Sequence, residues 1–178
     1  KATDEYTLAG NGVEEWEPRF TFHGFRYVAV SGLEETPDKD TVTGVVVYND
    51  MALTGEFECN HDLINKLQSN IQWGQRGNFI EVPTDCPQRA ERQGWTGDAQ
   101  VFAGTACFNM NVAAFYTKWM IDVADAQRDD GNFTDTVPDM YDCLNSAGWT
   151  DAGVIVPWNV YLYFGDRRAI FNGKRSRQ

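Results

Sequence analysis

The stretch "DAQVFAGTACFNMNVAAFYTKWMIDVADAQ", residues 98–127, decides the fold class. Its apolar residues recur at helical spacing in two sets: Val101, Phe102, Thr105 and Phe108, then Val112, Phe115, Trp119, Val123 and Ala126. The spacing breaks near residues 109–111. This pattern predicts two consecutive helices.

Two further helices are expected on either side of this pair. Before it, Asn60 can cap a helix that ends near Gly77. Four residues of this segment recur at helical spacing: Leu63, Leu67, Ile71 and Gly74. After it, "WTDAGVIVPWNVYLYFGDRR" at 149–168 begins with a turn, continues as an apolar helix and stops at Gly165. Pro157 is expected in the first turn of that helix. Each helix is apolar enough to need neighbours on more than one side.

The first third of the chain has a different pattern. "FTFHGFRYVAV" at 20–30 alternates large apolar residues with others, and "TVTGVVVYND" at 41–50 is β-branched. Both predict strands. The change of period near residue 59 is a candidate boundary, with the end of a β-domain at 1–58 and a helical domain at 59–178.

Composition excludes several partners. Among 178 residues, 15 basic and 26 acidic side chains leave a formal net charge of −11. Such a charge repels nucleic-acid phosphates and anionic lipids, so neither nucleic acid nor a membrane surface is an expected partner. No apolar run reaches the roughly 20 residues of a membrane span, and the first residues form no apolar signal region. The cellular location stays open, with a lean towards a secreted or periplasmic protein.

The cysteine and histidine spacing gives no metal motif. The four cysteines form no CxxC pair, and two histidines are available to join them: Cys59, Cys86, Cys107 and Cys143, with His23 and His61. We expect free thiols, although an even count also permits disulfides. No metal and no organic cofactor is expected.

The segment "PTDCPQRAERQGWTGDAQ", residues 83–100, gathers charge beside a large aromatic without any periodicity. Because Pro87 and Gly94 keep it out of a helix, the carboxylates of Asp85 and Glu91 can converge on one pocket. Paired carboxylates raise each other's pKa, and desolvation by Trp95 adds to this, which is how a glutamate is kept protonated as a general acid.

Arginines in the same segment oppose that role, since a nearby cation lowers a carboxyl pKa. A general acid at Glu91 therefore requires Arg89 and Arg92 to point at other acids, such as Asp85 or Asp98, or at substrate hydroxyls. The alternative is a salt-bridged surface loop anchored by its tryptophan. A nucleophilic Cys86 is disfavoured, because the nearest histidine in sequence is on another element.

The run "VPTDCPQRAERQGWTGDAQVFAGTACFNMNVAAFYTKWMIDVADAQ", residues 82–127, resembles the start of the catalytic domain of bacterial and fungal α-L-rhamnosidases of glycoside hydrolase family 78. So do "FTFHGFRYVAV", "GEFECNHDLINKLQSNIQWGQRGNF" and "DAGVIVPWNVYLYFGDRR", and the resemblance extends from about Arg19 to Arg168. It implies a mainly α fold, with part of an (α/α)6 barrel preceded by the last strands of a β-sandwich. It also implies inverting hydrolysis of terminal α-L-rhamnose from a glycoside or polysaccharide.

The family's loop pattern D-C-P-Q-R-x-E-R-x-G-W-x-G-D implies a role for each matching residue. Glu91 falls on the general acid. The sugar hydroxyls are held by the residues matching Asp85, Arg89 and Asp98, and the rhamnose pocket is lined by those matching Trp95 and Trp149. The sequence departs from the pattern at Ala90, where an acidic residue is common, and at "WTDAG", where "WGDAG" is common.

An inverting glycosidase also needs a second carboxylate, roughly 6.5–9.5 Å from the acid, to activate water. The resemblance places that base late in the barrel, beyond the matching region, and the barrel needs many more helices than the four expected here. We therefore expect this chain to hold the acid half of a site and to be inactive alone. The alternatives are a non-catalytic sugar-binding fragment and another inverting exo-glycosidase on the same barrel.

Overall fold

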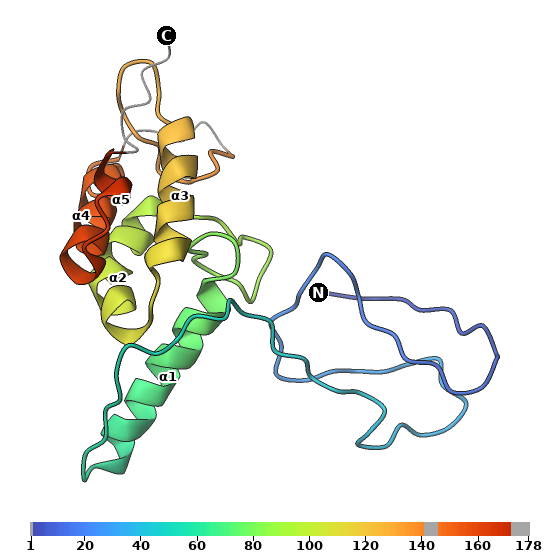
Figure 1. The fold of residues 1–178 in the computed structure, drawn as a ribbon. Helices are drawn as coiled ribbons and strands as arrows, with labels where there is room; N and C mark the ends of the chain where they lie inside the picture. Colours follow the sequence, from blue (N-terminus) through green and yellow to red (C-terminus); the bar gives the residue numbers. More distant parts are fainter. Residues whose placement is uncertain (1, 141–145, 172–178) are drawn as a thin grey trace.

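A computed structural model describes residues 2–140 and 146–171, and the regular secondary structure of these residues is helical (Figure 1). The elements are α1 (Asp62–Asn78), α2 (Thr96–Asn109), α3 (Ala113–Asp125), α4 (Ala152–Phe164) and α5 (Arg168–Phe171). The four long helices match those expected from sequence, including the break between α2 and α3. The short α5 was not predicted.

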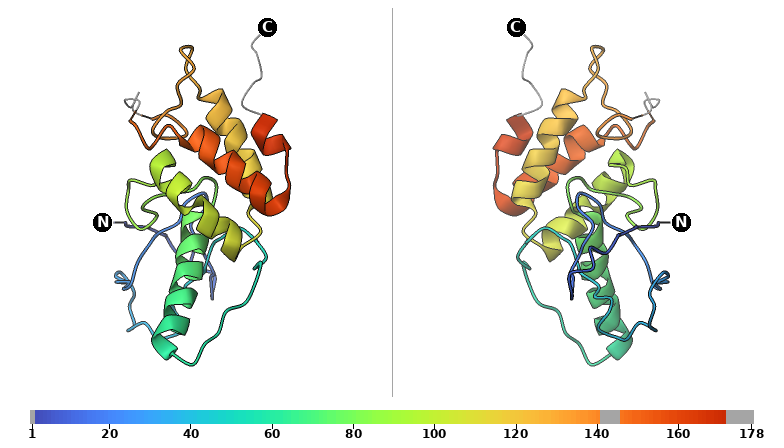
Figure 2. Two further views of the ribbon diagram at one scale, coloured as in Figure 1. Left: turned by 90° about the vertical axis from the view of Figure 1, so that its left-hand side faces the viewer. Right: turned by 90° about the vertical axis from the view of Figure 1, so that its right-hand side faces the viewer.

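Helix α4 packs against both α2 and α3, and α5 packs on α3 and α4 (Figure 2). The core between them is built from small residues of α2 and larger ones of α3: Ala99, Ala103, Ala106, Tyr116, Trp119 and Val123, with Val156 and Val160 of α4. The ring of Phe79, just after α1, stacks on Phe115 with 4.6 Å between centroids. The segment between α1 and α2 is therefore fixed at both ends: Phe79 holds its start, and the packing of α2 in the core holds its end.

The predicted buried face of α2 is wrong. Val101 is 83% exposed and Phe108 is 68% exposed, whereas Ala103 and Ala106 are fully buried. Alanines let the backbones of α2 and α4 approach closely, so this face makes the contact and the larger residues lie on the other side. Leu63 on α1 is likewise exposed. Spacing showed which residues share a face, but not which face is covered.

Two details of the helix ends also differ from expectation. Asn60 does not cap α1; His61 is the N-cap residue and makes no side-chain cap bond. The Asn65 amide instead bonds the backbone of Cys59, accepting from its N–H at 2.9 Å and donating to its carbonyl at 2.7 Å. Pro157 lies in the second turn of α4, because the helix begins as early as Ala152.

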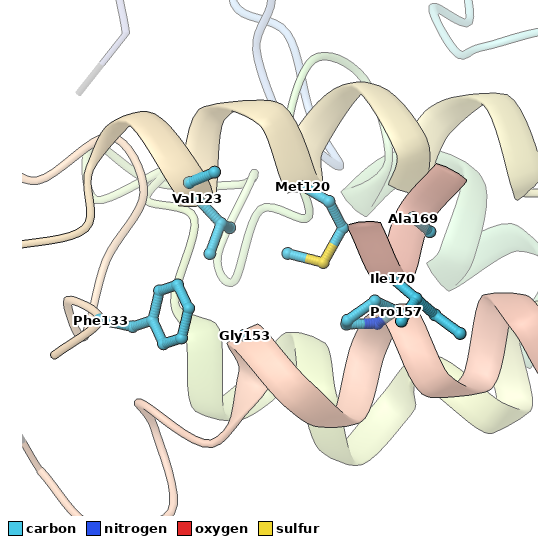
Figure 3. A pocket seen from close by; sticks show the side chains of 8 residues that line it. Met120, Val123, Phe133, Gly153, Pro157, Ala169 and Ile170 are labelled. Carbon is cyan, nitrogen blue, oxygen red and sulfur yellow. The ribbon is translucent and has the colours of Figure 1, made fainter. Parts of the chain in front are cut away.

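The end of α4 is confirmed: Gly165 follows the helix with a left-handed φ of 67°. Between α3, α4 and α5 lies a small pocket of about 20 Å³ whose lining side chains are apolar (Figure 3). At its edge the Phe133 ring lies against Gly153, where a Cβ would come within 2.3 Å of the ring. Gly153 is thus required for this packing.

Most of residues 2–58 project to one side of the helices as open, extended chain, and the last part of this segment runs along α1 (Figure 1). In this described part, the expected strands at 20–30 and 41–50 do not pair, and Leu53 makes a single isolated bridge to Met110. Tyr27 and Val45 are largely exposed. An alternating pattern favours a strand only when a neighbouring strand and a covering layer are present, and these residues have neither. The boundary at 58/59 stays a prediction.

Within residues 2–140 and 146–171, no helix combines the length and apolar character that crossing a bilayer requires. The thiols of Cys59, Cys86 and Cys107 are free. Cys143 lies outside the described residues.

Candidate active site

The charged loop connects α1 to α2, and its entry is fixed by the last residue of α1. The Asn78 side-chain amide donates to the carbonyls of Thr84 and Asp85, at 2.7 and 2.9 Å. The Thr84 N–H donates back to the Asn78 carbonyl at 2.8 Å. Sequence reasoning missed Asn78, because a polar residue at a helix end carries no signal for this use.

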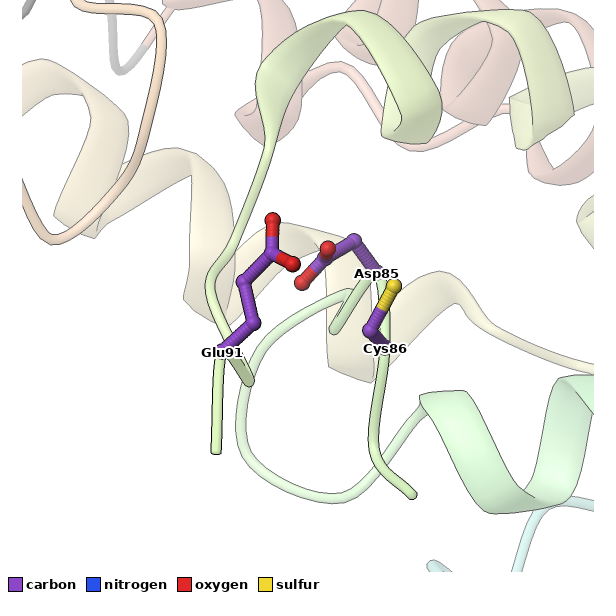
Figure 4. Close-up of side chains that lie close together, drawn as sticks. All are labelled: Asp85, Cys86 and Glu91. Atoms are coloured by element: carbon purple, nitrogen blue, oxygen red, sulfur yellow. The ribbon is translucent and has the colours of Figure 1, made fainter. Parts of the chain in front are cut away.

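Asp85 closes the loop on itself. Its N–H donates to the Gln93 carbonyl at 3.0 Å, and the Gln93 N–H donates to its carboxylate at 2.9 Å. This double bridge turns the intervening residues back, so that Asp85, Cys86 and Glu91 each place one ligating atom within 4.8 Å of the others (Figure 4). The expected convergence of the two carboxylates is therefore present in the structure.

Both oxygens of Glu91 have partners. Arg89 donates from Nη2 to Oε2 at 2.5 Å, and the Trp95 indole N–H donates to Oε1 at 3.1 Å. The expectation that Arg89 points away from Glu91 is wrong, because the two side chains leave the same exposed turn two residues apart. Trp95 is partly buried and turns its polar edge to this carboxylate.

The second arginine of the loop has a different direction. Arg92 donates from Nη2 to the Phe22 carbonyl at 2.6 Å and from Nε to the Pro87 carbonyl at 3.1 Å. Arg92 therefore contacts backbone rather than the acids that the sequence suggested.

Electrostatics separate the two aspartates of the site. For Asp85, burial opposes ionisation, but hydrogen bonds from Cys86, the Gln93 N–H and Glu91 outweigh it and lower the pKa below its ordinary value. For Asp98, desolvation raises the pKa, and the negative charges of Asp85 and Glu91 raise it further. The hydrogen bond to Asp85 also raises the pKa of the Cys86 thiol, which disfavours a nucleophilic thiolate.

A pocket of about 640 Å³ lies beside the loop, between α1 and the first turns of α2. Three of the residues proposed for substrate binding line it, namely Asp85, Asp98 and Trp149. Arg89, Glu91 and Trp95 are not among its lining residues and lie in the adjoining loop. Three of the six residues therefore lie at the pocket and three lie in the adjoining loop. Asp85 belongs to both places, because it lines the pocket and contacts Glu91 of the loop.

Trp149 reaches this pocket because α2 has no side chain at Gly97. A Cβ on Gly97 would come within 2.8 Å of the Trp149 indole. The segment before Trp149 is tied to α2 as well, since the Gln100 amide donates to the Gly148 carbonyl. Gly97 was missed by sequence reasoning, although it stands inside the W-x-G-D end of the loop pattern.

In the described part of the chain, Asp85, Cys86 and Glu91 form the one group with the proximity needed to ligate a metal ion. The carboxylate of Asp85 already accepts from the Gln93 N–H, and that of Glu91 accepts from Trp95 and Arg89. These contacts account for the cluster as a hydrogen-bonded unit, and the expectation that no metal is needed stays a prediction.

Two sequence profiles match the chain. The bacterial α-L-rhamnosidase six-hairpin glycosidase domain matches residues 52–173, and the bacterial α-L-rhamnosidase concanavalin-like domain matches residues 1–48. Among curated relatives, an α-L-rhamnosidase of Streptomyces avermitilis is 56% identical over 170 residues, which is 95% of this chain and 16% of the relative. An α-L-rhamnosidase of Formosa agariphila is 50% identical and matches 93% of this chain and 18% of its own length.

Solved structures agree with these matches. The S. avermitilis α-L-rhamnosidase complexed with L-rhamnose superposes with a TM-score of 0.90 at 54% identity, over 94% of this chain and 16% of that one. The native α-L-rhamnosidase of Aspergillus terreus gives 0.83 at 46% identity, over 92% and 20%. The chain spans about a sixth to a fifth of the length of these relatives. The helical structure and these neighbours confirm the fold class as mainly α with part of an (α/α)6 barrel.

Proposed function

This chain belongs to the bacterial α-L-rhamnosidases with a six-hairpin glycosidase domain, and we propose that it carries the proton-donating part of a site that hydrolyses terminal α-L-rhamnose with inversion. The observation that supports this most is the position of Glu91. Its carboxylate adjoins Asp85 and accepts from the indole of Trp95, beside a pocket lined by Asp98 and Trp149. The L-rhamnose complex of the S. avermitilis relative supports the choice of sugar.

In this proposal each residue has one task. Glu91 gives its proton to the glycosidic oxygen as the bond to the sugar breaks. Asp85, ionised because its pKa is lowered, accepts from sugar hydroxyls, and Asp98, which lines the same pocket, does so as well. Trp149 provides an apolar wall for the C–H face and methyl group of the sugar, and Trp95, in the adjoining loop, holds the Glu91 carboxylate through its indole N–H.

Arg89 must change partner during the reaction. Its contact with Glu91 stabilises the carboxylate, which opposes a proton on that residue. The Arg89 side chain is 61% exposed, so it can move to a sugar hydroxyl when substrate enters. Substrate binding would then both place Arg89 and free Glu91 to hold its proton.

We propose that the general base, the second carboxylate of the inverting pair, lies outside the 178 residues of this chain. Asp85 and Glu91 are at most 4.8 Å apart through their facing atoms, less than the roughly 6.5–9.5 Å that an inverting pair needs to admit water. Their side chains point at each other from one loop (Figure 4), so no sugar fits between them. We therefore expect the 178-residue chain alone to be inactive.

The test uses the complete gene product with phenyl α-L-rhamnoside, whose poor leaving group needs a proton to depart, and with the matching glucoside and mannoside. We expect release from the rhamnoside, and a fall of roughly 10²-fold or more in the Glu91→Gln variant. Glu56→Gln, at an exposed glutamate before α1, is the matched control. Full activity of the Glu91→Gln variant would refute the acid assignment, and preference for another glycoside would indicate a different exo-glycosidase.

The pocket supports a second candidate, a sugar-binding fragment without hydrolysis. Asp85, Asp98 and Trp149 present carboxylates and an indole to a space large enough for a monosaccharide. Calorimetric titration of the 178-residue chain with L-rhamnose distinguishes the two. Heat of binding would favour the fragment as a binding module, and its absence would favour a site that needs the complete protein.

A further inference from the structure

We propose that Arg92 is a positioning residue of this site, which holds the Glu91-bearing loop against residues 22–24 of the N-terminal part. The inference rests on the proposed function for its kinetic consequences, but its structural basis is independent of it. Arg92 follows Glu91 directly, so whatever fixes the backbone at Arg92 also fixes the direction of the Glu91 side chain.

The guanidinium of Arg92 makes three contacts with two different segments. It donates to the Phe22 carbonyl at 2.6 Å and to the Pro87 carbonyl at 3.1 Å. Its central carbon also lies 4.2 Å from the centroid of the Phe22 ring, in cation–π geometry. A planar fork of donors is suited to joining two carbonyls in this way.

The backbone at Arg92 needs such support. Its φ is 49°, in the left-handed region that residues with side chains seldom adopt. Residues hold such a conformation when their surroundings determine it. Here the surroundings are Phe22 on one side and Pro87, from the start of the same loop, on the other.

A second contact between the same segments does not involve Arg92. Gly24 lies against Gln88 so closely that a Cβ on the glycine would come within 2.4 Å of the Gln88 Cα. Residues 22–24 therefore lie against the loop at two places, near 88 and at 92. A shift of this segment would move Glu91 relative to Asp85.

Loss of Arg92 should therefore misplace the proton donor without removing it. A misplaced acid slows departure of a poor leaving group and hardly affects a good one, which leaves without a proton. General loss of folded protein would lower both rates equally. The ratio of the two rates thus distinguishes positioning from simple support of the fold.

The experiment compares unactivated phenyl α-L-rhamnoside with 2,4-dinitrophenyl α-L-rhamnoside, using the complete gene product. In Arg92→Ala we expect kcat for the phenyl glycoside to fall about tenfold or more, with kcat for the dinitrophenyl glycoside and both KM values within about threefold of wild type. Arg92→Lys should not restore the rate, because an ammonium cannot join both carbonyls in the same geometry. Gly24→Ala should give the same selective loss.

Arg26→Ala is the control, at an exposed arginine of the same N-terminal segment. Equal losses on both glycosides, or none, would overturn the proposal. Amide hydrogen exchange of residues 84–95 provides a readout that needs no activity: we expect faster exchange in Arg92→Ala and Gly24→Ala. Unchanged exchange would overturn the positioning role, whereas a wild-type protein inactive on both rhamnosides would overturn the proposed function alone.

Discussion

The guanidinium of Arg89 lies 2.5 Å from the carboxylate of Glu91. The Arg89 side chain is 61% exposed and the Glu91 side chain is 32% exposed, so water screens the pair and its contribution to stability is small. Its importance is chemical, because the cation sits on the group proposed to donate a proton. In the proposed function, the Glu91 carboxylate and the sugar hydroxyls therefore compete for the guanidinium of Arg89.

We predict that Arg89→Ala raises KM for an aryl α-L-rhamnoside more than it lowers kcat, by about tenfold in KM. The variant loses a contact to sugar hydroxyls but also loses the cation that opposes protonation of Glu91. Steady-state kinetics on the complete gene product measure both constants, with Arg19→Ala as a control at an exposed arginine. A fall in kcat with unchanged KM would contradict the hydroxyl-binding role.

Gly97→Ala should push Trp149 out of the pocket. The new Cβ would come within 2.8 Å of the indole, whereas alanine is favourable for the helix itself. We expect KM to rise about tenfold with little loss of thermal stability. Gly77→Ala is the matched control, since a Cβ there meets nothing within 4 Å inside α1. Equal effects of both substitutions would remove the special role of Gly97.

The helices were predictable because their information is local. Apolar residues three and four apart identify a helix without knowledge of its neighbours, which is why α2, α3 and the end of α4 at Gly165 were correct. The covered face of α2 was not predictable in this way. Ala103 and Ala106 make the contact with α4, and the pattern gave more weight to Val101 and Phe108.

The loop was predictable in part. Its lack of periodicity and its Pro87 correctly indicated that Asp85 and Glu91 converge. The arginine directions depend on non-local contacts: Arg92 finds the Phe22 carbonyl, 70 positions earlier in the chain. That leaves Arg89 beside Glu91, an outcome that the charge pattern alone could not decide.

The two aspartates should change stability with pH in opposite directions. The pKa of Asp85 in the folded protein is lower than its ordinary value of 3.8. Ionised Asp85 therefore stabilises the fold above pH 3.8, and this stabilisation is lost as the pH falls through the folded-state pKa. Asp85→Asn should therefore lower the melting temperature more at pH 7 than at pH 2. Thermal melts at both pH values measure this, and an equal loss at the two would indicate a packing defect.

The pKa of Asp98 is shifted in the opposite direction. Its pKa is raised, so the folded state binds this proton more tightly, and the resulting stabilisation is present below 3.8 and lost as the pH rises through the folded-state value. Asp98→Asn should gain melting temperature relative to wild type at pH 7 and show no such gain at pH 3. A lower melting temperature at pH 7 would show that the carboxylate stabilises the fold through contacts with its neighbours.

The stereochemistry of the product tests where the second carboxylate lies. Facing atoms of Asp85 and Glu91 are at most 4.8 Å apart, closer to the about 5–5.5 Å of a retaining pair than to an inverting one. Asp85 is nevertheless a poor nucleophile, because its carboxylate already accepts from the Gln93 N–H and faces Glu91. We predict that proton NMR of early hydrolysis shows β-L-rhamnose forming first, as water displaces the aglycone from the opposite face. If α-L-rhamnose forms first, the reaction retains configuration, and a covalent sugar on Asp85, detectable by mass spectrometry and absent in Asp85→Asn, would replace the inverting scheme.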